Sequence, residues 1–329
     1  MYNTKILIVG LGSIGKRHLD NLIFLGYRNL VVVSKKNKPL DKKYENLKFY
    51  KYISNIKDKD IKIAFICTPT SFHQKNYFSL VKKNILSFYV EKPLTNTCNN
   101  AKLFLEDTEL KKTKVYVGYD MRFDIGLNIV KEKINSQELG KALFFNAEVG
   151  QYLPSWRKED YSKSYSSIKK LGGGVMLDLI HELDYLYWLF GSYKSFIGLN
   201  KKISDLNINT EDVSLNIIEM NCGVLGTLTL DYLQPKLSRK IKIVFSKGTL
   251  IWDYNEGFLT KITLDNTEKI QYKNLTRNER FLTIIDTFLK KILLNEDSTK
   301  LVSAKDGFIS LQAIELLKKS NLKGKKITT

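Results

Sequence analysis

Short apolar segments alternate with amphipathic stretches over about the first 118 residues of this 329-residue chain. The apolar segments carry few charges, which is typical of parallel strands covered on both faces. This alternation predicts βαβ units that form a parallel sheet. The expected strands are residues 5–9, 30–33, 61–66, 87–90 and 115–118, and the expected helices are residues 14–26, 71–83 and 99–110.

Beyond residue 120 the apolar positions recur mostly with a period of two, which predicts antiparallel strands. The expected strands are residues 142–149, 213–220, 224–232, 241–245, 249–252 and 258–264, and the expected helices are residues 126–134, 175–190, 280–293 and 304–320. We therefore predict an α/β Rossmann domain with a parallel sheet over residues 1–120. An α+β domain with a mostly antiparallel sheet is expected over residues 121–329.

The composition narrows the class of protein. Hydrophobic residues make up 43% of the chain, but no apolar run approaches the ~18 residues that a membrane span needs. The formal net charge is +19, with the lysines dispersed, so we expect anionic small ligands and no nucleic-acid or membrane partner. Three distant cysteines and an N-terminal strand in place of a signal peptide predict reduced thiols and a cytoplasmic location.

A glycine-rich loop, Gly10-x-Gly12-x-x-Gly15, follows the first strand and opens a helix. Gly10 permits the tight turn, Gly12 lets the backbone approach a pyrophosphate, and Gly15 lets helix and strand pack closely. The free N–H groups of the first helical turn, from Ser13 and Ile14 onward, suit phosphates. The alternative is an ordinary turn between a strand and a helix.

The end of the second strand bears on the choice of dinucleotide. An NAD site usually has an acid here for the ribose 2′-hydroxyl, whereas this chain has Ser34-Lys35-Lys36. A hydroxyl and two cations suit a 2′-phosphate, so we predict NADP(H) in preference to NAD(H). The alternative is that two more lysines carry no meaning in a lysine-rich chain.

The segment Glu91-Lys92-Pro93 follows the strand at 87–90. Ligands of open α/β sheets bind at the carboxyl ends of the strands, so Lys92 is placed to donate a hydrogen bond to a substrate oxygen. Pro93 restricts the lysine before it and makes a cis peptide bond possible. A plain strand end is the alternative.

A second chemical cluster follows three glycines at 172–174. The spacing of Asp178, His181 and Tyr185 predicts one face of a helix from 175 to 190. A carboxylate one turn before an imidazole orients it as a general base. A buried polar pair that stabilises the helix is the alternative, and no metal site is expected because further ligands are missing.

Other candidates are weaker. His18, a turn past the glycine loop, is expected to be structural. His73, after Thr68-Pro69, is either a helix-start residue or a neighbour of the cofactor. In the loop at 151–161, Tyr152 and Trp156 offer aromatic faces and Arg157 could bind a phosphate or carboxylate, although each could equally belong to a structured surface loop.

Together these motifs resemble the glucose–fructose oxidoreductase, inositol dehydrogenase and rhizopine-catabolism (Gfo/Idh/MocA) family. The motifs that carry the resemblance are the glycine loop with His18, Cys67-Thr-Pro69 with His73, Glu91-Lys92-Pro93, Arg122-Phe123, and Gly172-Gly-Gly with Asp178, His181 and Asp184. The family's fold pairs a Rossmann domain with a domain whose large open sheet binds substrate and is usually used for oligomerisation.

The resemblance implies NAD(P)-dependent oxidation or reduction of a ring carbon in a sugar, inositol or nucleotide sugar. Lys92 matches the family's catalytic lysine, and Asp178 and His181 match its carboxylate and histidine, with two residues between them instead of the usual three. The loop at 152–157 looks most like members from bacterial surface-sugar biosynthesis. A catabolic inositol or polyol dehydrogenase and a non-catalytic cofactor-binding regulator are the alternatives.

The predicted site follows from these arguments. We expect a homodimer or homotetramer with Lys92, His181 and Asp178 as catalytic residues. The predicted cofactor contacts are Gly10, Gly12, Ser13, Ile14, Gly15, Ser34, Lys35, Thr68, Pro69, His73, Glu91 and Lys92, and the predicted substrate contacts are Lys92, Arg122, Trp156, Arg157, Asp178 and His181.

Overall fold

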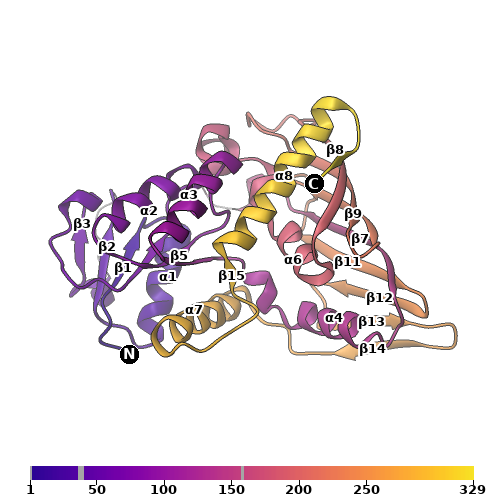
Figure 1. Ribbon diagram of the computed structural model, residues 1–329, viewed down its shortest axis with the longest axis horizontal. Coiled ribbons are helices and arrows are strands. Elements are labelled where there is room, and N and C mark those ends of the chain that lie inside the picture. The colour runs from indigo at the N-terminus through magenta and orange to yellow at the C-terminus, as the bar shows by residue number, and fades with distance from the viewer. Residues whose placement is uncertain (1, 36–40, 157–158) are drawn as a thin grey trace. The chain divides into compact units, whose positions relative to one another are not determined.

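The computed structural model of the protein describes residues 2–35, 41–156 and 159–329 (Figure 1). It contains two compact units. Unit 1 comprises Met1–Asp120 and Arg277–Phe308, and unit 2 comprises Met121–Thr276 and Ile309–Thr329. The chain therefore leaves unit 1 after residue 120 and returns to it for a second segment.

Unit 1 contains a seven-stranded sheet in the order β15-β6-β5-β4-β1-β2-β3. Six strands are parallel, and the short β15 pairs antiparallel with β6. Every residue of β1, β2 and β4 is buried, as the charge-poor segments predicted. The strands are β1 (Ile6–Val9), β2 (Leu30–Val33), β3 (Lys48–Tyr50), β4 (Ile63–Ile66), β5 (Ser87–Val90), β6 (Lys114–Val117) and β15 (Val302–Ser303).

The helices of unit 1 include one that the sequence analysis assigned to the other domain. They are α1 (Ser13–Phe24), α2 (His73–Val81), α3 (Cys98–Leu110) and α7 (Arg277–Leu294). The prediction placed all of 121–329 in the second domain, but α7 lies against α1 in unit 1 (Figure 1). Phe288 of α7 packs its ring 5.6 Å from that of Phe65 and 5.4 Å from that of Tyr89. Amphipathic periodicity shows that a helix is covered, but not by which sheet.

Unit 2 contains a nine-stranded sheet in the order β14-β13-β12-β11-β7-β10-β9-β8-β16. It is antiparallel except where β10 pairs with β7. The Rossmann-type sheet followed by a mostly antiparallel sheet confirms the predicted fold class. The strands are β7 (Ala142–Gly150), β8 (Tyr193–Lys201), β9 (Val213–Met220), β10 (Leu225–Asp231), β11 (Ser238–Phe245), β12 (Gly248–Asp253), β13 (Phe258–Ile262), β14 (Thr267–Gln271) and β16 (Ile327–Thr328).

The two faces of this sheet differ. One face is covered by helices that include α4 (Ile125–Ser136), α6 (His181–Phe190) and the end of α8 (Ala304–Lys323) (Figure 1). The opposite face carries large apolar side chains that are 42–52% exposed, namely Phe144, Ile197, Leu199, Leu215, Ile217 and Leu225. No helix among the described residues is long and apolar enough to cross a membrane.

The predicted helix 175–190 is wrong as a single element. The chain forms α5 (Val175–Asp178) and then α6, with Leu179 and Ile180 between them in turn conformation. Leu179 has φ −101° and ψ 27°, which ends the first helix. Asp178 and His181 therefore do not share one helix face, although their spacing predicted it.

Candidate active site

The glycine loop has the geometry that its sequence predicted. Gly10 has φ +96°, and a Cβ there would lie 2.8 Å from the Cys67 carbonyl oxygen, while a Cβ on Gly15 would lie 1.9 Å from the Gly10 carbonyl oxygen. Gly12 caps α1, and a Cβ there would meet nothing within 4 Å. The loop is therefore closed on the sheet side and open at Gly12. Ser13 and Ile14 form the first turn of α1, whose free N–H groups suit a phosphate.

The end of β2 lies beside a cationic segment that the sequence analysis missed. The Ser34 N–H donates to the Tyr50 carbonyl oxygen at 2.9 Å because β2 and β3 are paired. As a result Lys35 and Lys51 place their Nζ atoms 5.9 and 5.8 Å from the centre of the Tyr52 ring. Lys36 lies outside the described residues. Two cations thus meet at the predicted ribose end of the site.

The turns after β1, β4 and β5 lie at one sheet edge because these strands are parallel neighbours. The glycine loop follows β1, Thr68 and Pro69 follow β4, and Lys92 follows β5. The Lys92–Pro93 peptide bond is cis. The arrangement brings the predicted cofactor loop and the predicted catalytic lysine to the same edge, where open α/β sheets bind ligands.

Two buried histidines lie at this edge. His18 Nε2 lies 2.5 Å from Glu91 Oε1, and these residues are 0% and 7% exposed. His73, the first residue of α2, places Nε2 2.8 Å from the Thr68 carbonyl oxygen and Nδ1 3.0 Å from that of Pro93. Burial lowers the pKa of His73, although both carbonyl oxygens favour its protonated form. His73 is thus a helix-start residue that links two turns of the predicted site.

In unit 2, Asp178 has a partner that the sequence did not reveal. The Tyr232 hydroxyl donates to Asp178 Oδ2 at 2.7 Å. Burial, and then the Asp178 carboxylate, raise the pKa of Tyr232 well above its usual value, so this hydroxyl keeps its proton. The Trp156 ring meets that of Tyr232 edge-on at 5.3 Å. Tyr232 is 54 residues from Asp178, and no local pattern signals the pair.

His181 begins α6, whose first turn is held by two buried ion pairs. Arg122 Nη2 and Nε donate to the two Asp184 oxygens at 2.7 and 3.0 Å, and Arg239 Nε donates to Glu182 Oε1 at 2.6 Å. Arg122, a predicted substrate contact, is 3% exposed, so the structure shows it fixing the helix that carries His181. Arg157, another predicted substrate contact, lies outside the described residues.

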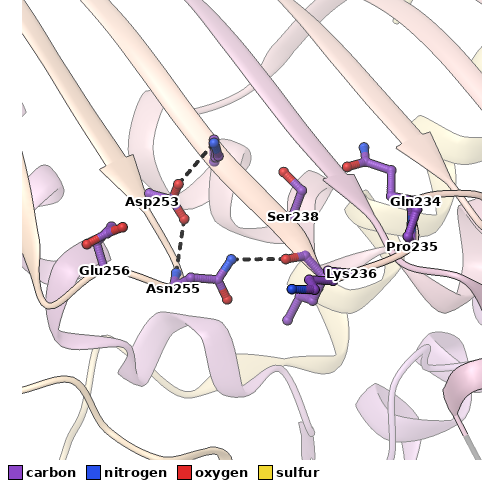
Figure 2. A pocket seen from close by; sticks show the side chains of 9 residues that line it. Gln234, Pro235, Lys236, Ser238, Asp253, Asn255 and Glu256 are labelled. Carbon is purple, nitrogen blue, oxygen red and sulfur yellow. Dashed lines mark hydrogen bonds and ion pairs between the residues drawn. The ribbon is translucent and has the colours of Figure 1, made fainter.

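A surface hollow of about 460 Å³ lies elsewhere in unit 2 (Figure 2). Its lining comes from the loop before β11, the start of β11, the end of β12 and the turn after it. Lys240 is paired with Asp253 there, and the Asn255 amide donates to the Leu237 carbonyl oxygen. None of the predicted catalytic, cofactor or substrate residues that the structure describes lines it. The chemistry of the predicted site is therefore not that of this hollow.

Comparisons with known proteins agree with this geometry. A family model described as "Oxidoreductase family, NAD-binding Rossmann fold" matches residues 4–119, and one described as "GFO/IDH/MocA C-terminal domain" matches residues 128–251. The fold and these matches define an oxidoreductase with an NAD-binding Rossmann domain. The chain belongs to the GFO/IDH/MocA family, as the motifs predicted.

Two relatives and one solved structure show what the chain is similar to. The chain is 23% identical to the myo-inositol 2-dehydrogenase of Thermotoga maritima, over 96% of each chain. It is also 23% identical to an inositol 2-dehydrogenase/D-chiro-inositol 3-dehydrogenase of Lacticaseibacillus casei, over 93% of this chain and 89% of the relative. The WlbA dehydrogenase of Bordetella pertussis, solved with NADH and UDP-GlcNAcA, has a TM-score of 0.82 at 17% identity and 99% coverage of both chains. At this identity the structural likeness establishes the fold.

Proposed function

We propose that the protein is an NAD(P)-dependent dehydrogenase that moves a hydride to or from a ring carbon of a sugar or nucleotide sugar. The observation that carries the proposal is the common sheet edge of the glycine loop and Lys92. Membership of an oxidoreductase family supports it, since hydride transfer needs a dinucleotide and a polar group that acts on the reacting oxygen. A regulator without catalytic activity would not need such a lysine.

The proposed mechanism assigns one role to each residue. In the oxidative direction a hydride leaves the carbinol carbon and a proton leaves its oxygen, so a carbonyl forms. A dinucleotide held at the glycine loop after β1 would supply the hydride acceptor. Lys92 donates a hydrogen bond to the oxygen and stabilises its developing charge, and His181 takes the proton. Asp178, which accepts a hydrogen bond from Tyr232, takes its proposed role from the family resemblance, as the carboxylate that stabilises protonated His181.

NADP(H) is the proposed cofactor. Lys35 and Lys51 beside Tyr52 form a cationic site after β2 and β3, and the two described residues directly after β2, Ser34 and Lys35, include no acid. An ammonium beside the ribose favours a 2′-phosphate, whereas NAD sites use a carboxylate. The WlbA structure contains NADH, so we expect this chain to differ from that neighbour in its choice of cofactor.

The substrate class separates two versions of the proposal. The UDP-GlcNAcA in the WlbA structure supports a nucleotide sugar as substrate. The sequence resemblance of residues 152–157 supports a role in bacterial surface-glycan biosynthesis. The inositol dehydrogenases among the relatives favour a free polyol, which makes a catabolic inositol or polyol dehydrogenase the second candidate. Both versions use the same catalytic residues.

A homodimer or homotetramer built on the exposed sheet face completes the proposal. Ile197 and Leu199 of β8 lie directly opposite Ile217 and Leu215 of β9, so four exposed apolar side chains form one patch. Contiguous exposed apolar surface of this kind marks an association site. Light scattering should give a dimer or tetramer, and Ile217→Lys should give a monomer.

The three cysteines, none in a disulfide, support the expected cytoplasmic location.

Thermal stability of the pure protein tests the function. Ligands that bind the folded state raise the melting temperature by mass action. The proposal expects a larger rise with NADPH than with NADH, and a further rise with UDP-GlcNAcA. A further rise only with myo-inositol would favour the catabolic version. No rise with either dinucleotide at high concentration would contradict the dehydrogenase.

A further inference from the structure

Buried histidines contact the residues on both sides of Lys92. His18 of α1 holds the side chain of Glu91, which precedes the lysine, with 2.5 Å between Nε2 and Oε1. His73 of α2 faces the carbonyl oxygen of Pro93, which follows the lysine, with 3.0 Å between Nδ1 and that oxygen. The two histidines are 0% and 1% exposed. The residues before and after Lys92 are thus contacted from two different helices.

Both imidazole rings are fixed by their surroundings. The His18 ring lies among the rings of Phe65, Tyr89 and Phe281, with centres 5.6, 5.1 and 5.6 Å away. Nε2 of His73 lies 2.8 Å from the Thr68 carbonyl oxygen, so each ring nitrogen faces a carbonyl oxygen, and the neutral ring donates to one of the two. Because the His18 ring is enclosed, and because a turn of the His73 ring would move its nitrogens away from both oxygens, neither ring can turn without losing its contact beside Lys92.

We propose that His18 and His73 are positioning residues for Lys92. The proposal rests on the proposed function, in which Lys92 donates to the reacting oxygen. A shift of about 1 Å in a catalytic group can reduce turnover by about 10²-fold, which is what these contacts prevent. Glu91 is a predicted cofactor contact, but one of its carboxylate oxygens faces the buried His18 imidazole. In this proposal Glu91 therefore links His18 to the residue next to it, Lys92.

The two contacts use different ring nitrogens, and this allows a matched test. An asparagine amide nitrogen lies near the place of Nδ1, and a glutamine amide nitrogen lies near that of Nε2. His18→Gln therefore keeps a donor for Glu91, and His18→Asn loses it. At position 73 the contact beside Lys92 is made by Nδ1, so asparagine is the conservative replacement. His73→Asn keeps a donor for the Pro93 carbonyl oxygen, whereas the amide of His73→Gln lies near the Thr68 carbonyl oxygen.

Each variant is characterised by two measurements, its steady-state kinetics and the acetylation of Lys92. Steady-state kinetics with NADPH or NAD⁺ and UDP-GlcNAcA or myo-inositol give kcat and KM. Acetylation of Lys92 by acetic anhydride, followed by mass spectrometry across a pH series, reports the state of the lysine amine without any turnover. His18→Asn and His73→Gln should lower kcat by about 10²-fold, leave the KM for the dinucleotide within about twofold, and change the Lys92 acetylation profile.

The rescuing variants, His18→Gln and His73→Asn, should stay within about tenfold of the native kcat and keep the native acetylation profile. Tyr89→Phe is the control for a change in the same buried cluster, because no described residue bonds its hydroxyl, and it should leave both readouts unchanged. If a His18 variant does not fold, Glu91→Gln and Glu91→Leu probe the same contact, and the leucine should have the lower kcat.

The proposal is overturned if Asn and Gln behave alike at both positions, or if all four folded variants keep the native kcat and acetylation profile. Lys92→Ala is measured in parallel. Near-native turnover of that variant would refute the proposed function, whereas the acetylation profiles of the histidine variants would still decide whether His18 and His73 position Lys92.

Discussion

Replacing Arg122 with methionine should destabilise unit 2 strongly. The side chains of Arg122 and Asp184 are 4% and 0% exposed and are joined by two hydrogen bonds of 2.7 and 3.0 Å. Methionine fills a similar volume but removes the cation, so the Asp184 carboxylate stays buried without it. We expect the first turn of α6, which begins at His181, to lose its anchor.

The magnitude follows from the burial of both groups. Removing one partner of a buried ion pair costs about 3–5 kcal/mol, because the remaining charge is uncompensated. The double variant Arg122→Met with Asp184→Asn should recover part of that loss, since no full charge then remains. Arg122→Lys keeps the charge but not the two parallel hydrogen bonds, and its free energy of unfolding should lie between those of the native protein and Arg122→Met.

Tryptophan fluorescence during urea unfolding measures the free energy of unfolding of unit 2, which contains Arg122. All three tryptophans, Trp156, Trp188 and Trp252, belong to unit 2, so the signal reports that unit. A loss of less than about 1 kcal/mol in Arg122→Met, of the size seen for exposed pairs, would refute the structural role. If the KM for substrate then rose sharply, Arg122 would be the substrate contact that the family resemblance implied.

Three further predictions concern unit 1. Gly15→Ala should abolish dinucleotide binding, because its Cβ would lie 1.9 Å from the Gly10 carbonyl oxygen; isothermal titration checks this, and binding at native affinity would contradict it. Lys35→Asp should shift the preference from NADPH toward NADH, since it replaces a cation with the acid typical of NAD sites; the ratio of kcat/KM values measures the shift. The free energy of unfolding should fall as pH drops below about 6.5, because burial lowers the pKa of native His73 and only the unfolded state then binds the proton. Urea unfolding followed by circular dichroism measures this free energy across the pH range. His73→Asn should lose less stability at low pH than the native protein, and an equal loss would show that His73 is not the group responsible.

Local patterns account for most of the fold. The bounds of β2, β5 and β9 agree with prediction, because apolar runs mark β2 and β5, and β9 alternates between apolar and polar residues apart from its adjacent Ile217 and Ile218. The strands β3 and β14 were missed because three to five residues with mixed polarity carry little periodicity. The nine-residue β8 was also missed, because its adjacent Phe196 and Ile197 interrupt the alternation. The return of α7 to unit 1 also depends on tertiary packing, which no local pattern encodes.

Some features of the candidate site could likewise be predicted from local sequence, and others depend on contacts between distant residues. The glycine loop and Lys92 could be identified because each motif lies next to a strand whose position was clear. The break between α5 and α6 could not, because it accompanies contacts made far along the chain, by Tyr232 with Asp178 and by Arg239 with Glu182. The pairing of His18 with Glu91 joins residues 73 positions apart, so sequence analysis gave His18 only a structural role.

The most direct test of the central claim is turnover by Lys92→Ala, followed through the absorbance of NADPH or NADH, together with its affinity for the dinucleotide. The account predicts that kcat falls by about 10²–10⁴-fold, the range attributed to a positioned group that assists proton movement, while the dissociation constant of the cofactor stays near the native value. Near-native turnover by this variant would contradict the assignment of Lys92 as the catalytic lysine.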